Sequence, residues 1–145
     1  MDPKNEIRKK TMFLGSFTEK EKSAFYALAK GLIAADEVLD ERETSLMEEY
    51  LEEMKISFDD LSVMTPEVAI ETFCTSEKTV RRQAYIELVS LSMADENFDE
   101  TEKAYLAHVA EGLDLSKNEA DALAACVSEL LRVYEKMGSL IAGRA

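Results

Sequence analysis

Residues 34–43 read AADEVLDERE, and residues 93–102 read MADENFDETE. A shift of 59 positions superimposes these two acidic phrases, and the match extends over about 24–60 and 83–119. Self-similarity at a fixed offset is the signature of a structural repeat. Because only two copies are present, we expect pseudo-symmetry inside one domain of residues 1–145 and no solenoid.

The composition favours a helical globular protein. Of the 145 residues, 46% are hydrophobic and 32% are charged, and only two prolines and five glycines interrupt the chain. Such a profile is typical of a folded domain, and a chain of this length buries about 68–70% of its extended surface. Apolar residues recur at spacings of three and four, which indicates helices. The sequence therefore predicts an all-α fold, with six to seven helices in one compact domain built from two pseudo-symmetric helical hairpins.

Each copy has the pattern of a helix, an acidic turn and a second helix. Thr18 and Glu21 have the spacing of a capping box, and Thr65 followed by Pro66 is typical of another helix start. The predicted apolar stripes of the first copy are Phe25, Leu28, Ala29, Leu32 and Ile33 on one helix, and Leu46, Met47, Tyr50, Leu51 and Met54 on the next. Glutamates 48, 49, 52 and 53 form a solvated acidic flank on that second helix.

The second copy repeats this pattern with a helix over about 77–94 and another from about 100, which Gly112 is placed to end. Ser116 and Glu119 then predict a capping box for a long last helix. Its stripe is Leu123, Val127, Leu130, Tyr134 and Met137, and the alanines at 120, 122, 124 and 125 favour close packing.

The acidic turns have a structural interpretation that needs no ligand. Asp40 precedes a predicted helix and Glu43 follows three residues later, and Asp99 and Glu102 repeat this spacing. An Asp at a helix start accepts from backbone N–H groups, and the Glu reaches back to the cap, with each cap contributing about 1 kcal/mol.

Asp36 and Asp95 are harder to assign, because each follows a helix whose negative end disfavours a carboxylate. One interpretation is a turn in which the carboxylate accepts backbone hydrogen bonds. The others are a divalent cation or a protein partner. An EF-hand is excluded, since its required Gly and bidentate Glu are replaced in both copies. The candidate metal ligands are Asp36, Asp40, Glu43, Asp95, Asp99 and Glu102.

The two hairpins, with their turns at 35–43 and 94–102, resemble the tellurite-resistance TerB-like family over about 18–137. That family commonly has Gly after the first Asp, where this chain has Glu37 and Glu96. The resemblance implies an all-helical domain associated with stress and tellurite resistance, suspected metal binding by the acids of the turns, and membrane-linked partner complexes.

The net charge of −13 disfavours nucleic acid and anionic membranes as partners, and no apolar run is long enough to insert directly into a bilayer. Cys74 and Cys126 are predicted to be buried free thiols in a reducing cytoplasm. His108 is the only histidine, and no phosphate-binding glycine loop is present.

We therefore expect a non-enzymatic interaction domain of TerB-like type, whose acidic turns contact a protein partner of unknown identity. The alternative is a domain that binds a divalent cation at those turns, and a small hydrolase or lyase ranks last. The sequence leaves the oligomeric state open.

Overall fold

The computed structural model describes residues 13–34, 41–94 and 100–144. Within these ranges the chain forms six α-helices, two short 3-10 helices and no strand, which confirms the predicted fold class. The elements are η1 (Leu14–Ser16), α2 (Glu19–Ala34), α3 (Glu41–Met54), η2 (Phe58–Asp60), α4 (Pro66–Cys74), α5 (Lys78–Ala94), α6 (Glu100–Gly112) and α7 (Lys117–Ile141).

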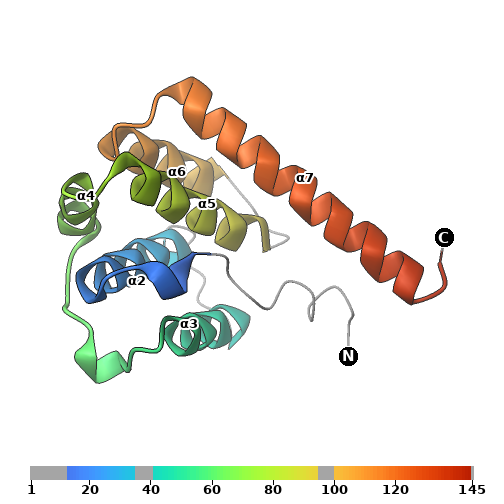
Figure 1. Ribbon diagram of the computed structural model, residues 1–145, viewed down its shortest axis with the longest axis horizontal. Helices are drawn as coiled ribbons and strands as arrows, with labels where there is room; N and C mark the ends of the chain where they lie inside the picture. The colour runs from blue at the N-terminus through green and yellow to red at the C-terminus, as the bar shows by residue number, and fades with distance from the viewer. Residues whose placement is uncertain (1–12, 35–40, 95–99, 145) are drawn as a thin grey trace.

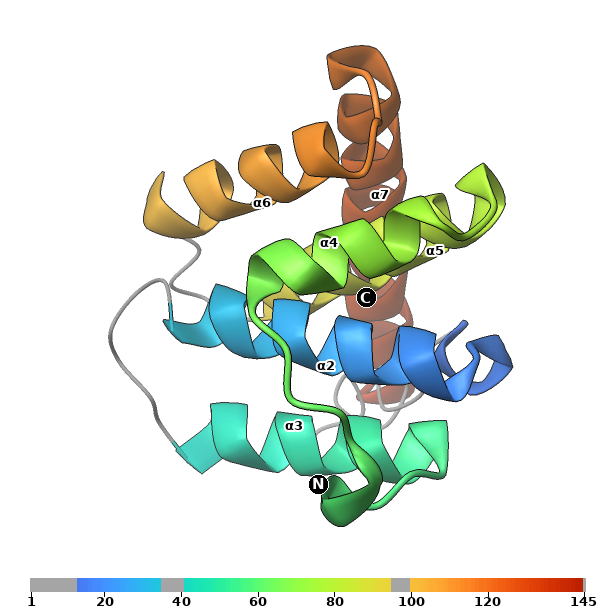
Figure 2. The ribbon, with the colours of Figure 1, turned by 90° about the vertical axis from the view of Figure 1, so that its left-hand side faces the viewer.

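The helices are stacked, with α2 near the centre (Figures 1 and 2). Helix α3 lies on one side of α2, and α4 and α5 lie on the other side, with α6 beyond them. Contacts of α2 with α4 are the most extensive, followed by those of α5 with α7. Helix α7 runs across the stack, and its C-terminal half extends past the body of the molecule.

The two hairpins have matching boundaries. Helices α2 and α5 begin 59 positions apart, and so do α3 and α6. The chain leaves α3 and α6 in the same way: Lys55 and Asp114 have φ angles of 56° and 60°. The amides of Ile56 and Leu115 donate to the carbonyls five residues earlier, at 3.2 and 3.0 Å. This pattern is the Schellman motif, in which a residue with positive φ satisfies the last carbonyls of a helix.

Gly112 therefore does not end α6 by its backbone freedom, as the sequence suggested, because the residue with positive φ is Asp114. Gly112 is the last residue of the helix, and a Cβ there would lie 2.7 Å from Cγ2 of Ile70. Its role is close packing against α4.

The start signals of α2, α4 and α7 are confirmed, whereas a predicted cap at Ser57 is wrong. The amide of Glu21 donates to Thr18 Oγ1, and Glu21 Oε1 accepts from the Thr18 amide. Thr65 caps α4 with Pro66 at its first turn, and Ser116 forms a complete capping box at the start of α7. Ser57 precedes η2, but its hydroxyl donates to the Asp60 carboxylate instead of capping the backbone.

Aromatic side chains join α2 to α3 and connect the segment before α2 to α4. The rings of Phe17 and Phe73 meet edge to face at 5.8 Å, and Phe25 and Tyr50 do so at 5.6 Å. Such edge-to-face pairs are favoured over stacked sandwiches because the positive ring edge meets the negative face. All predicted stripe residues of α2 are buried, as are Met47 and Met54 of α3, so the interpretation of these methionines as packing residues is confirmed.

Three predictions about burial are wrong. Cys74 and Cys126 are exposed, although the Cys74 thiol donates to the carbonyl of Gly112 at 3.2 Å. Ala122 and Ala125 are also exposed, so the alanine-rich stretch is not packed on all sides. Met137, the last member of the α7 stripe, is exposed because that part of α7 lies beyond the helices that cover its first half.

Candidate functional site

The acidic turns connect four helix ends that the structure describes. Helix α2 ends at Ala34 and α3 begins at Glu41, while α5 ends at Ala94 and α6 begins at Glu100. The predicted helix starts, directly after Asp40 and Asp99, are therefore confirmed. Figure 2 shows the end of α2 and the starts of α3 and α6 toward the same side of the molecule.

A half-buried contact holds this end of the molecule together. Tyr105, in the second turn of α6, donates a hydrogen bond from Oη to the carbonyl of Leu28 near the end of α2, at 2.8 Å. Burial, with a smaller contribution from Glu67, raises the pKa of Tyr105 far above its ordinary value. The hydroxyl therefore stays protonated and remains a donor.

Gly31 makes this contact possible. It lies one turn after Leu28 in α2, and a Cβ at this position would overlap with Tyr105 Oη and lie 3.0 Å from Cζ. The second hairpin is thus attached to the first where α2 approaches the first acidic turn. No pattern in the sequence predicts this link, since Gly31 and Tyr105 are 74 positions apart and neither forms part of a motif.

Most of the predicted metal ligands lie outside the described residues. Asp36, Asp40, Asp95 and Asp99 belong to the ranges 35–40 and 95–99, and Glu43 is described only as part of the α3 backbone. Glu102 is the one predicted ligand whose side chain is described. Among the residues with described placement, no group of three or more His, Cys, Asp or Glu side chains could hold a metal ion.

Acids in a turn are expected to be exposed to solvent, but Glu102 is buried, with 3% of its surface exposed. It is the third residue of α6, which is the position that the capping-box interpretation requires. A carboxylate is buried only where polar partners compensate for lost water, so Glu102 has a structural constraint that the outer acids of α3 lack.

The acidic flank of α3 continues into the following connection. Glu48 and Glu52 are exposed, and Asp59 and Asp60 follow in η2, also exposed. Phe58 lies beside these aspartates with 63% of its surface exposed, and its ring meets Tyr26 edge to face at 6.2 Å. This stretch presents negative charge together with apolar surface.

A cavity of about 530 Å³ lies between α5, α6 and α7. Its lining is mostly apolar and includes Val89, Leu106 and Ala120, with Lys103 and Asp121 among its charged members. The volume is within the range of ligand sites, about 300–1,000 Å³. Two basic and two acidic residues line it, however, so its lining does not select an anionic or a cationic ligand.

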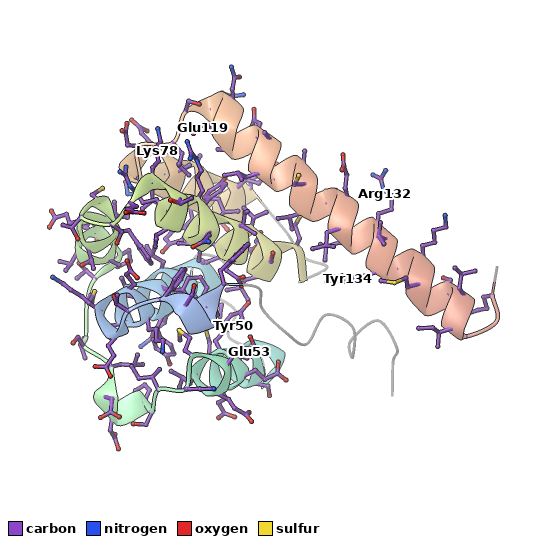
Figure 3. The ribbon with its side chains drawn as sticks, in the orientation of Figure 1. Tyr50, Glu53, Lys78, Glu119, Arg132 and Tyr134 are labelled. Atoms are coloured by element: carbon purple, nitrogen blue, oxygen red, sulfur yellow. The ribbon has the colours of Figure 1, made fainter. Side chains whose placement is uncertain are left out.

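The strongest described ion pair supports the fold. Figure 3 shows Lys78 and Glu119 where α5 and α7 begin. Arg82 donates to Glu119 Oε1 at 2.7 Å, and Lys78 lies 3.6 Å from Oε2. The hydrogen bond from the Ser116 amide, followed by that from Arg82, lowers the pKa of Glu119 to about 2. Glu119 is therefore a fixed anion that joins two helix starts.

Two further observations bear on function. His108 is exposed on α6. Within the described part of the chain, no helix is both long and apolar enough to cross a membrane.

No protein-family profile, curated protein or solved structure matches this chain.

Proposed function

We propose that this chain is a non-enzymatic interaction domain of TerB-like type, with its two acidic turns forming the surface that a protein partner contacts in a cytoplasmic stress-response or tellurite-resistance assembly. The observation that carries the proposal is the hydrogen bond from Tyr105 to Leu28, which fixes the end of α2 beside the first turns of α6. Both acidic segments therefore connect to helix ends that are held together, and one partner could contact both.

Charge and surface composition support the same proposal. The chain carries 30 acidic and 17 basic residues. On α3, which follows the first acidic turn, the exposed side chains of Glu48 and Glu52 are also acidic. A basic partner would be attracted to this side from a distance, and its association rate would fall as salt increases. Phe58 adds an exposed ring next to the acids, and aromatic residues are enriched where interfaces form.

The test compares two variants that lose the same charge at different places. Asp36→Asn with Asp95→Asn neutralises one acid in each turn, whereas Glu48→Gln with Glu52→Gln neutralises two exposed acids of α3. Each protein is immobilised, incubated with extract of the native cells and analysed by mass spectrometry after crosslinking. The melting temperature of each variant is measured in parallel to identify a loss of folding.

We expect the turn variant to lose the proteins that the unmodified chain retains, and the α3 variant to keep most of them. Crosslinks should map to the helix ends around the turns. The proposal is wrong if the unmodified chain retains no specific protein, or if both variants lose the same proteins equally. Equal loss would indicate attraction by net charge alone.

The alternative function is divalent-cation binding by the same turns. Its support is the burial of Glu102 in a stretch that carries four other acids between 95 and 102, because buried carboxylates either have polar partners or bind metals. Calorimetric titration with calcium, magnesium, zinc and manganese tests it. Heat above the buffer blank that Asp95→Asn abolishes would support a site, and absence of both heat and a change in melting temperature would exclude one.

A further inference from the structure

Helix α7 changes environment along its length. An apolar repeat with spacings of three and four runs along the whole helix, through Ala120, Leu123, Val127, Leu130, Tyr134, Met137 and Ile141. In the first half this repeat packs on α5, and Ala120 and Val127 are buried. In the second half the helix extends past the body, where Leu130 and Tyr134 are half-buried and Met137 and Ile141 are exposed.

The exposed part of this face is large. Val133, Met137, Leu140 and Ile141 have exposed fractions of 51%, 37%, 57% and 66%. The opposite side of the helix is polar. Figure 3 shows Arg132 and Tyr134 on opposite sides of α7, and the remaining polar residues of this stretch are Glu135, Lys136 and Ser139. The second half of α7 is therefore amphipathic, with an apolar face that the fold itself does not use.

We propose that this face is a dimer interface, in which residues 130–141 of α7 pack against the same residues of a second copy. In an antiparallel pair around a two-fold axis, Leu130 would face Ile141 of the partner copy, and Tyr134 would face Met137. Each of these four side chains then meets an apolar side chain of the other copy, as a self-complementary interface requires.

Charge favours a second copy as the occupant. The whole chain has a net charge of −13, so most of its surface repels another copy. Residues 126–144 carry only two acids and three bases, so this stretch adds little to the repulsion between two copies. A basic partner would instead be attracted to the acidic side around α3, and an anionic partner would be repelled by the body.

The length of the stretch sets the expected affinity. Twelve helical residues span about 18 Å and supply fewer side chains than the roughly 20–30 residues per partner of a standard interface. We therefore expect a reversible dimer with a dissociation constant on the order of 10 µM. This inference is independent of the proposed function, because it uses a different helix and a different face.

Sedimentation velocity between roughly 1 and 500 µM tests the proposal. The weight-average mass of the full chain should rise from 16.3 kDa toward twice that value. Met137→Glu and Tyr134→Lys should each raise the dissociation constant at least roughly tenfold, as expected for residues at the centre of an interface. Arg132→Glu, on the polar side of the same helix, is the matched control. Its weight-average mass at each concentration should equal that of the unmodified chain.

Mixing the two interface variants tests the antiparallel register. In a mixed dimer the introduced Glu at 137 of one copy would face the introduced Lys at 134 of the other. The second pair, between the remaining Tyr134 and Met137, would be unaltered, so dimerisation should return. A parallel pair would not be restored in this way. Circular dichroism before mixing establishes that both variants are folded.

Three results would overturn the proposal. The first is a monomer at all concentrations for the full chain. The second is a dimer that Met137→Glu and Tyr134→Lys leave unchanged. The third is a full-length monomer that dimerises only after residues 1–12 are deleted, because those residues would then be the occupant of the face.

Discussion

The contact between Gly31 and Tyr105 allows a sharp test of how the two hairpins are joined. In a helix interior Gly is less favourable than Ala by roughly 0.5–1 kcal/mol, so helix propensity alone predicts that Gly31→Ala stabilises the protein. The structure predicts the opposite. The new methyl group would overlap with Tyr105 Oη and lie 3.2 Å from Cγ of Pro66, so the tyrosine ring would have to move.

The size of the effect follows from three contributions. Overpacking a filled site costs about 1–3 kcal/mol, and loss of the hydrogen bond to Leu28 costs about 0.5–1.5 kcal/mol. The propensity gain offsets up to about 1 kcal/mol of this. We therefore expect Gly31→Ala to lower the free energy of unfolding by about 1–3 kcal/mol, which corresponds to a fall in melting temperature of roughly 3–9 °C.

A double-mutant cycle with Tyr105→Phe isolates the contact. Tyr105→Phe alone should lower the free energy of unfolding by about 0.5–1.5 kcal/mol, because only the hydrogen bond to Leu28 is lost. It also removes the oxygen that blocks the methyl group, so Gly31→Ala should be at least about 1 kcal/mol less costly in the Phe background. Gly15→Ala is the control, since its Cβ would come no closer than 3.9 Å to a carbonyl oxygen.

Urea unfolding followed by circular dichroism measures all four proteins of the cycle. Two results would contradict the reasoning. One is a higher free energy of unfolding for Gly31→Ala, which would mean that helix propensity outweighs the contact. The other is additivity of the two substitutions within about 0.5 kcal/mol, which would mean that the methyl group and the hydroxyl do not interact.

Four further predictions concern separate features. Ser116→Ala should lower the free energy of unfolding by about 0.5–2 kcal/mol in urea titrations through loss of the α7 cap, and an unchanged midpoint would contradict this role. Phe73→Ala should cost about 3–5 kcal/mol, and a loss below 1 kcal/mol would mean that the aromatic cluster is not tightly packed. Because the pKa of Glu119 is lowered from 4.5 to about 2 in the folded chain, its contribution is present above pH 4.5 and is lost as the pH falls toward 2. Thermal melts of Glu119→Gln should show less acid destabilisation in that window, and curves parallel to those of the unmodified chain would refute this. Cys74 and Cys126 should both react with Ellman's reagent in the native chain, whereas reaction only after unfolding would contradict their exposure.

The sequence determined the local elements of this protein. Capping residues specify where α2, α4 and α7 begin, since a cap satisfies backbone groups within three residues of itself. The spacing of apolar residues likewise specified the buried stripe of α2, because residues three and four positions apart lie on one face of a helix. The acids before α3 and α6 indicated those helix starts for the same local reason.

Only the tertiary structure decided which faces find a neighbour. Val127 and Met137 belong to one apolar repeat, yet Val127 is buried and Met137 is exposed, because α5 covers α7 over only part of its length. The exposure of Cys74 and Cys126, the burial of Glu102 and the contact of Tyr105 with Leu28 have the same origin. Each depends on residues far away in the chain, and their approach is set by the packing of whole helices, which spacing along the sequence does not encode.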